Sequence, residues 1–128
     1  MYEILFSEQM IGNLKVPNRI VMTAMGNHMA TRGGTASDID VEFYGARAKG
    51  GVGLVISECV TIDYASGKGN FGQMSADDDQ FIPGLKKVAD AVHAHGSLIA
   101  GQIYHPGRQG ITDLSGVPTM IAPSEVEC

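Results

Sequence analysis

The chain has 128 residues, of which 44% are hydrophobic and 18% are charged. This balance is typical of a globular protein and excludes a disordered chain, because a disordered segment lacks the apolar side chains that a core requires. The net charge of −5 argues against nucleic acid as a partner, since phosphate binding needs a basic surface.

The two cysteines and the N-terminus indicate the compartment. Cys59 and Cys128 are too few for a disulfide scaffold and form no C-x-x-C motif, so both are predicted to be free thiols in a reducing environment. No basic segment precedes an apolar one at the N-terminus, as a signal peptide would require. The apolar runs are shorter than the roughly 18 residues of a membrane span. We therefore expect a cytoplasmic protein with no membrane partner.

The N-terminal part of the chain alternates short apolar stretches with turn residues. Two such stretches flank Gly12-Asn13, which indicates a small hairpin. The run 19–25 (RIVMTAM) is apolar and β-branched, and it predicts the first strand of the main sheet. A loop over residues 26–37, with paired glycines, then leads to the first helix.

The first helix is predicted to begin after Ser37. A serine followed three residues later by an acidic residue, here Asp40, is typical of a capped N-terminus. Gly50-Gly51 marks the end of the helix. The apolar residues that recur at helical spacing, and that are expected to face the core, are Ile39, Phe43 and Ala46.

A second strand, a second helix and a third strand follow. The run 52–60 (VGLVISECV) is nearly all apolar and fits a strand buried on both faces of a parallel sheet. After a long loop, Pro83 opens a helix that Gly96 closes. The run 97–105 (SLIAGQIYH) predicts the third strand. The residues expected to line the apolar face of the second helix are Leu85, Val88, Ala89 and Val92.

The order strand, helix, strand, helix, strand predicts an α/β fold with a parallel sheet and right-handed crossovers. Both an open doubly wound sheet and a (β/α)8 barrel satisfy this order. In both architectures, ligands bind at the carboxyl ends of the strands. Polar residues gather after the predicted strands, above all in GQIYHPGRQ (101–109). We therefore expect the functional site at this end of the sheet.

Several residues near these strand ends have both a structural and a functional interpretation. Gln102 carries an amide that needs a donor and an acceptor, which either the backbone or a planar heterocycle can supply. Arg32 and Arg108 either bind an anion or brace their loops. The small residues within 23–26 either let a flat ligand approach the backbone closely or simply end a strand.

Glu58 falls inside a strand that is predicted to be buried. A buried carboxylate needs a partner, because an unpaired charge is costly away from water. We expect a structural ion pair with Arg19 or Arg47, and a functional role is the alternative.

Three histidines raise the question of a metal site, because H-x-H is a known ligand spacing on a strand. His93 and His95 close a helix, however, where residues two apart point in different directions. A hydrolase with a metal on these residues and His105 is therefore disfavoured, and we predict no metal site. No G-x-G-x-x-G motif follows a predicted strand at the start of a helix, so a Rossmann dinucleotide site is not supported. The P-loop lysine motif and the G-x-S-x-G motif are absent from the sequence.

Four motifs follow one another along the chain. They are NRIVMTAM (18–25), RAKGGVGLVISE (47–58), GQIYHPGR (101–108) and IAPS (121–124). Together they resemble the Old Yellow Enzyme family of FMN-dependent NAD(P)H oxidoreductases, and most closely its branch of 2,4-dienoyl-CoA reductases and enoate reductases. The resemblance implies a (β/α)8 barrel in which FMN takes a hydride from NADH or NADPH. The flavin then passes it to an activated C=C bond of a small α,β-unsaturated substrate.

The resemblance also implies individual site residues. Those implied to bind FMN are Thr23, Ala24, Met25, Gly26, Cys59 and Gln102, and those implied to line the substrate pocket are Tyr104 and His28. Residues 23–26 would lie along the isoalloxazine ring, and Gln102 would pair with its pyrimidine edge. No catalytic residue is assigned, because the family's substrate-anchoring pair and proton donor lie downstream of these motifs.

Length separates this chain from a complete enzyme of that kind. A (β/α)8 barrel needs about 250 residues, whereas three strands are predicted within these 128 residues. We expect residues 1–128 to be the N-terminal portion of a single FMN-binding barrel domain, with about three βα units. Any 4Fe-4S cluster and FAD would belong to a C-terminal part. The alternative is a non-catalytic fragment that acts as an assembly module. An open sheet exposes its edges, so we predict that the isolated chain is either marginally stable or associates as a homo-oligomer.

Overall fold

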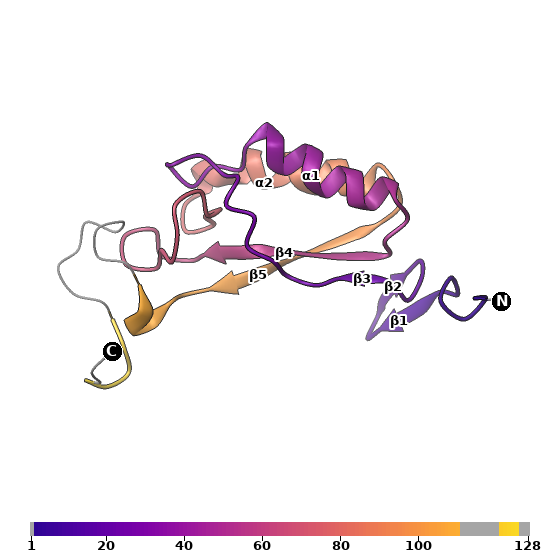
Figure 1. The fold of residues 1–128 in the computed structure, drawn as a ribbon, viewed down its shortest axis with the longest axis horizontal. Helices are drawn as coiled ribbons and strands as arrows, with labels where there is room; N and C mark the ends of the chain where they lie inside the picture. The colour runs from indigo at the N-terminus through magenta and orange to yellow at the C-terminus, as the bar shows by residue number, and fades with distance from the viewer. Residues whose placement is uncertain (1, 111–120, 126–128) are drawn as a thin grey trace.

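The computed structural model describes residues 2–110 and 121–125 (Figure 1). Its strands are β1 (Gln9–Ile11), β2 (Leu14–Val16), β3 (Val21–Met22), β4 (Leu54–Thr61) and β5 (Leu98–Tyr104). Its helices are α1 (Asp38–Lys49) and α2 (Ile82–His93), with 3₁₀ turns at Asp79–Phe81 and Gly107–Gln109. Within the described residues, no helix is both long enough and apolar enough to cross a membrane.

The predicted N-terminal hairpin is confirmed. β1 pairs antiparallel with β2, and Ile11 lies opposite Leu14. Gly12, in the connection, has a φ of 58°, a conformation that glycine adopts without steric cost. Figure 1 shows the hairpin near the amino ends of the main-sheet strands, away from the loops that follow these strands.

The main sheet has the strand order β3-β4-β5, and both strand pairs are parallel. α1 connects β3 to β4, α2 connects β4 to β5, and Figure 1 shows both helices on the same side of the sheet. A sheet that adds each new strand beside the previous one places its crossover helices on one face, whereas a doubly wound sheet reverses its strand order. The described strands contain no reversal, so this part of the chain is wound like a barrel.

The first strand of this sheet is shorter than predicted. The sequence predicts a strand over 19–25, but β3 contains two residues. Before β3, the Asn18 side chain bonds the backbone: its Oδ1 accepts from Ile20 N at 3.0 Å and its Nδ2 donates to the Gly51 carbonyl at 2.8 Å. The other two strands begin and end within two residues of the predicted runs 52–60 and 97–105.

Helix α1 begins as predicted but buries a different face. The Ser37 hydroxyl accepts from Asp40 N at 3.2 Å, and the Asp40 carboxylate accepts from Ser37 N at 2.8 Å, which completes a capping box. The predicted apolar face is confirmed only for Phe43, which is half-buried against the core. It is wrong for Ile39, which is 60% exposed, and for Ala46, which is also exposed. The buried residues of the helix are Asp40, Tyr44 and Ala48. The polar groups of Asp40 and Tyr44 form hydrogen bonds inside the protein, which apolar spacing alone does not reveal.

Helix α2 packs against α1 and the sheet. Pro83 in its first turn and the φ of 76° at Gly96, just beyond its end, confirm the predicted limits. Val88 and Val92 are buried, as predicted. The residues of the common core are Ala30, Tyr44, Ala48, Val55, Val60, Met74, Val88 and Val92. Met74 comes from the loop between β4 and α2, so this loop is part of the core.

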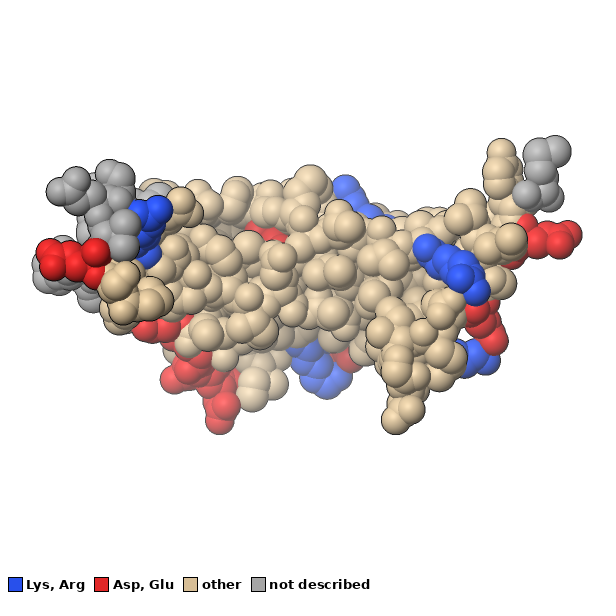
Figure 2. All heavy atoms as spheres, turned by 90° about the horizontal axis from the view of Figure 1, so that it is seen from below, with Lys and Arg blue, Asp and Glu red and all other residues tan. Residues whose placement is uncertain are grey.

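The face of the sheet away from the helices is uncovered in the described part of the chain. Successive side chains point to opposite faces of a strand, so the neighbours of the core residue Val55 point to this second face. Leu54, Ile56 and Leu98 are half-buried there, and Ala100 is exposed. Figure 2 views the molecule from this side, and the middle of the surface consists mainly of uncharged residues.

Candidate functional site

The loops that follow β3, β4 and β5 lie at one end of the sheet (Figure 1). Because the three strands are parallel, their carboxyl ends share this end. A β-bridge between Thr61 and Ser75 anchors the loop after β4. The Ala30 amide donates to the Gly72 carbonyl at 2.9 Å, which joins the loop after β3 to the loop after β4. The predicted site residues therefore lie on connected loops and on the strands that precede them.

Cys59 and Gln102 are direct neighbours on β4 and β5. The register of these strands shifts between Ile56 and Cys59, after which Cys59 pairs with Gln102. This β-bulge brings the two side chains together, and the Cys59 thiol donates to Gln102 Oε1 at 3.2 Å. Burial, reinforced by the charge of Glu58, raises the pKa of Cys59. The thiol therefore stays protonated at neutral pH and keeps its donor role toward Gln102.

Cys59 is a free thiol, as predicted. The same prediction for Cys128 falls outside the described residues.

Residues 23–26 continue from β3 toward the same end of the sheet. Thr23, Met25 and Gly26 are exposed, and Ala24 is half-buried. This stretch is therefore accessible along its backbone. The strand order separates it from β5 by β4, so the stretch and Gln102 approach the site from opposite sides of Cys59.

His28 lies close to this stretch in an unusual backbone conformation. Its φ is 55°, in the left-handed region that residues other than glycine seldom adopt. A Cβ added at Gly26 would lie 3.1 Å from atoms of the His28 ring, so the imidazole covers Gly26. The missing side chain at Gly26 thus makes room for the histidine ring.

Glu58 is buried, but without the predicted ion pair. It is 1% exposed, and its Oε2 accepts from the backbone N–H groups of Asn27 at 2.9 Å and His28 at 3.1 Å. The expected partners, Arg19 and Arg47, form hydrogen bonds with other groups. The ion-pair prediction is wrong, because two backbone amides bind Oε2, while Oε1 is buried and has no hydrogen-bond partner among the described residues. Residue types do not reveal which backbone segment folds over a buried side chain.

The burial of Glu58 makes the stability of the fold depend on pH. Burial raises its pKa above 4.5, and the hydrogen bonds from the His28 and Asn27 amides offset this only in part. A carboxyl group whose pKa is raised by folding stabilises the fold fully below its unfolded pKa, and this contribution is lost as the pH rises through the folded pKa. We therefore expect the free energy of unfolding of the wild-type chain, relative to Glu58→Gln, to fall as the pH rises from about 4.5.

Urea unfolding at a series of pH values measures this difference. Glu42→Gln, at an exposed position of α1, is the control and should follow the wild-type curve. If Glu58→Gln and wild type differ by the same amount at every pH, the carboxyl group does not have a raised pKa.

Tyr104 lies at the end of β5 and is half-buried. Its hydroxyl contacts the loop after β4, since a Cβ added at Gly69 would lie 2.8 Å from it. Burial raises the pKa of Tyr104, and the neighbouring Cys59 adds to the shift. Tyr104 is two residues from Gln102, so the two side chains point to the same face of the strand.

A chain of hydrogen bonds at the end of β5 was not anticipated from the sequence. Gly107 N donates to His105 Nδ1 at 3.0 Å, so the neutral ring carries its proton on Nε2, which lies 3.3 Å from Ser66 Oγ. The Ser66 hydroxyl donates to Asp63 and lowers the pKa of that carboxyl. Because His105 donates to Ser66, it does not act as a base toward it. The sequence hints at this contact between the loops after β4 and β5 only through Asp63 and Ser66, which are typical turn residues.

The arginines and helix-end histidines that the sequence singled out do not gather into a second site in the described residues. The Arg32 guanidinium lies over the Phe71 ring, 5.6 Å from its centre. Arg108 is exposed in the 3₁₀ turn after β5. His93 ends α2, His95 follows in the next turn, and both are exposed. In the part of the chain that the structure describes, no three potential metal ligands gather.

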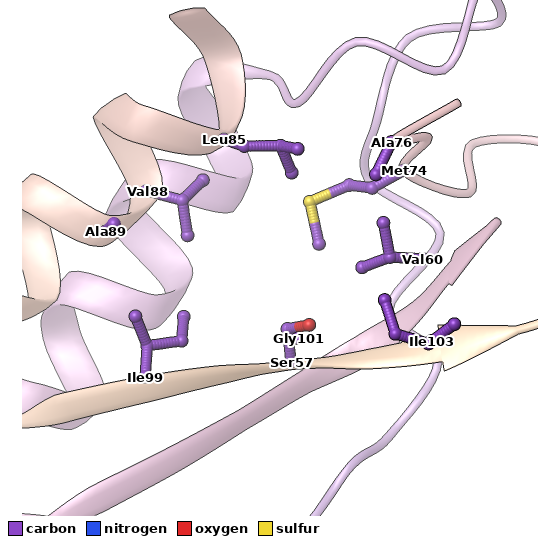
Figure 3. A pocket seen from close by; sticks show the side chains of 10 residues that line it. All are labelled: Ser57, Val60, Met74, Ala76, Leu85, Val88, Ala89, Ile99, Gly101 and Ile103. Carbon is purple, nitrogen blue, oxygen red and sulfur yellow. The ribbon is translucent and has the colours of Figure 1, made fainter. Parts of the chain in front are cut away.

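A separate cavity lies on the helix side of the sheet. Its volume is about 270 Å³, and Figure 3 shows its side chains between α2 and the strands β4 and β5. Val88 of α2 and Ile99, Gly101 and Ile103 of β5 belong to its lining. These β5 residues alternate with Gln102, so the cavity and Gln102 lie on opposite faces of the strand. The lining is mostly apolar, and the cavity therefore offers packing surface rather than chemistry.

A parallel α/β sheet wound in one direction, with polar groups at its carboxyl end, is typical of cofactor-binding barrels. The chain belongs to the NADH:flavin oxidoreductase / NADH oxidase family, which it matches over residues 4–127. It is 44% identical over 124 residues to the NADH oxidase of Thermoanaerobacter brockii. The matched region covers 97% of this chain and 19% of that protein. The chain thus spans about a fifth of the length of this relative. The cofactors of the family are FMN and NADH or NADPH.

Solved structures share the fold. A 2-naphthoyl-CoA reductase in complex with 2-naphthoyl-CoA matches with a TM-score of 0.85 and 39% identity, over 91% of this chain and 18% of that one. The Old Yellow Enzyme homologue from Zymomonas mobilis matches with a TM-score of 0.83 and 31% identity, over 90% of this chain and 32% of that one. The resemblance to the Old Yellow Enzyme family is confirmed. These neighbours are barrels, and the chain corresponds to an α/β portion of them.

The described residues fit a flavin at the carboxyl end of the sheet. The Cys59 thiol donates a hydrogen bond to Gln102 Oε1. The Nε2 donor of the same amide can therefore bind a ligand. Ala24 carries a small side chain, which leaves room for a planar ring against the backbone there, whereas the His28 ring covers Gly26. A ring in this position would bring its polar edge to Gln102 and its face to uncharged residues.

Proposed function

We propose that residues 1–128 are the N-terminal portion of a single FMN-binding (β/α)8 barrel domain, with about three βα units, in an FMN-dependent NAD(P)H oxidoreductase of the ene-reductase type. When bound, FMN takes a hydride from NADH or NADPH and passes it to an activated C=C bond of a small α,β-unsaturated substrate. The chain supplies part of the site, and residues beyond it supply the remainder.

The contact between Cys59 and Gln102 carries this proposal. It holds an amide and a thiol from neighbouring strands on one face of the sheet, near the end where parallel α/β proteins bind their ligands. In our proposal, Gln102 binds the pyrimidine edge of the flavin through Nε2. Cys59 fixes the orientation of that amide and contacts the pyrimidine side of the ring.

The other candidate residues have roles on either side of that edge. Residues 23–26 would lie along the isoalloxazine ring, where Thr23 or the following amides would bond near its N5 and O4 edge. His28 and Tyr104 line the substrate pocket. The position of the His28 ring over Gly26 and the shared face of Tyr104 and Gln102 support these two roles.

Two of the solved neighbours support the proposal that the substrate is a small molecule that is reduced and that the hydride donor is a nicotinamide. One is a reductase bound to 2-naphthoyl-CoA, and another is morphinone reductase in complex with tetrahydroNAD. Both names describe reduction, and the second complex contains a nicotinamide analogue. We propose further that the protein acts in the cytoplasm without a nucleic-acid or membrane partner, that copies of the chain associate, and that any 4Fe-4S cluster or FAD belongs to a C-terminal part.

Titration of the purified chain with FMN, followed by flavin fluorescence and absorbance, tests the proposal. We expect Gln102→Leu to weaken FMN binding about tenfold, because one hydrogen bond to the ring is worth roughly 1 kcal/mol or more. Gln9→Leu, on β1 at the opposite end of the strands, is the matched control and should bind like wild type.

Each outcome assigns a different role to the chain. Stoichiometric binding that depends on Gln102 means that residues 1–128 rebuild a flavin site by themselves or as an oligomer. If this chain does not bind FMN but a longer protein that continues from it does, then the chain forms half of a site. If neither binds FMN, the proposal is wrong and the alternative of a non-catalytic assembly module stands.

A further inference from the structure

Two consecutive backbone amides converge on one buried oxygen atom. Glu58 Oε2 accepts from Asn27 N at 2.9 Å and from His28 N at 3.1 Å. Glu58 belongs to β4 and is 1% exposed, whereas the two amides belong to the loop after β3. The contact therefore fastens a site loop to the strand that also carries Cys59.

This convergence is an anion-binding geometry. Successive N–H groups point to one side when the backbone combines right-handed and left-handed residues, and such a concavity, called a nest, binds anions. His28 is the left-handed member, with a φ of 55°. In most nests the anion is a ligand, but here it is the carboxylate of the protein itself.

Side chains around the nest fix the same turn. The Tyr44 hydroxyl accepts from Glu58 N at 2.8 Å and from Asn27 Nδ2 at 3.3 Å. Asn27 Oδ1 accepts from Met29 N at 3.2 Å, which closes the turn over His28. Tyr44 and Glu58 are both fully buried, so loss of the bond between Glu58 N and the Tyr44 hydroxyl leaves an unsatisfied group away from water.

The conformation of the turn decides where the histidine ring lies. With its backbone in the left-handed region, His28 places its imidazole against Gly26, at the end of the stretch 23–26. A non-glycine residue pays about 1–2 kcal/mol for this conformation. The hydrogen bonds from the Asn27 and His28 amides to Glu58 favour this conformation, because both amides reach the same oxygen only when the turn is folded in this way.

We propose that Glu58 is a positioning residue, whose carboxylate fills the Asn27–His28 nest and thereby holds the His28 ring and the 23–26 stretch in place at the carboxyl end of the sheet. The role assigned to that stretch rests on the proposed function, since the stretch borders the flavin there. The geometric part of the proposal, an internal anion that holds a left-handed histidine, does not depend on FMN.

Proton–nitrogen NMR spectra of the isotope-labelled 128-residue chain test this directly. Amide protons bonded to a carboxylate resonate far downfield, so we expect this of Asn27 and His28. In Glu58→Ala both resonances should move upfield together. Added formate should enter the emptied nest and restore them, whereas equal chloride serves as the ionic-strength control. Glu42→Ala, at an exposed position of α1, should leave both resonances unchanged.

Rescue separates positioning from a purely structural contribution. A side chain that only fills space is not replaced by formate, so restored resonances support the nest and unrestored ones overturn it. If Glu58→Ala does not fold, Glu58→Gln retains the shape and an acceptor. Its Asn27 and His28 amides should still shift upfield because the acceptor has lost its charge, and unchanged amides would overturn the proposal. Failure of both this chain and a longer chain to bind FMN would overturn the proposed function and leave this result intact.

Discussion

Replacement of Tyr44 by alanine is expected to lower the free energy of unfolding by about 3–5 kcal/mol. Tyr44 is fully buried, and its ring packs edge-on against Phe43 with 5.1 Å between the ring centres. The alanine variant loses this ring and leaves a cavity between α1 and the sheet. It also leaves the buried Glu58 N–H without the hydroxyl that accepts from it at 2.8 Å. Urea unfolding followed by circular dichroism measures the loss, which is a large fraction of the stability of a typical domain.

Tyr44→Phe separates the hydroxyl from the ring. This variant keeps the packing and removes only the oxygen, so we expect a loss of about 1–3 kcal/mol from the unsatisfied amide. Burial raises the pKa of Tyr44 to about 12, so the hydroxyl is neutral at ordinary pH and this cost should not vary there. Tyr2→Phe, at a position that is 65% exposed, is the control and should have no effect. An unchanged stability for Tyr44→Phe would contradict the hydrogen bonds to Glu58 and Asn27.

Gly72→Ala is expected to destabilise the fold for two reasons that act together. Gly72 has a φ of 71°, and an alanine in that region costs about 1–2 kcal/mol. A Cβ at this position would also lie 2.8 Å from the carbonyl carbon of His28 and closer still to its oxygen. Both are backbone atoms and cannot rotate away, so the turn that carries His28 must shift. We therefore expect a loss clearly larger than the cost of the positive φ alone.

Gly96→Ala is the matched control for this variant. Gly96 has a similar φ of 76°, but a Cβ there would meet no atom within 4 Å. The difference in unfolding free energy between Gly72→Ala and Gly96→Ala isolates the contacts with the backbone of His28 and Ala30. In addition, Gly72→Ala should move the His28 amide resonance, and Gly96→Ala should not. Equal losses and an unmoved resonance would show that the loop after β4 does not press on the turn.

Local preferences of the backbone explain which elements were predictable. Ser37 with Asp40, Pro83 and Gly96 mark helix limits through hydrogen-bond and dihedral preferences that involve a few neighbouring residues. Gly12 marks the hairpin turn in the same way. The order of strands and helices then predicts the parallel sheet, because crossovers are right-handed. The four motifs, taken together in their order along the chain, indicated the protein family, which no single residue could have done.

Part of the candidate site was predictable for a similar reason. Gln102 and the stretch 23–26 end strands, and parallel strands bring their carboxyl ends to one edge. That Cys59 lies beside Gln102 depends on the bulge between Ile56 and Cys59, which shifts the register by tertiary packing. Without that shift, alternation along β4 would place a different residue opposite Gln102.

The sequence by itself therefore determined the helix limits, the parallel α/β order and the family of this chain, because short-range preferences and shared motifs encode these. Only the tertiary structure decided that α1 buries Asp40 and Tyr44, that Glu58 pairs with the Asn27 and His28 amides and not with an arginine, and that Cys59 donates to Gln102. For Tyr44, Glu58 and Cys59 the partner is a backbone or polar group from another segment of the chain. Such pairings depend on how the elements pack, because a buried polar group takes whichever partner the fold brings within hydrogen-bond distance.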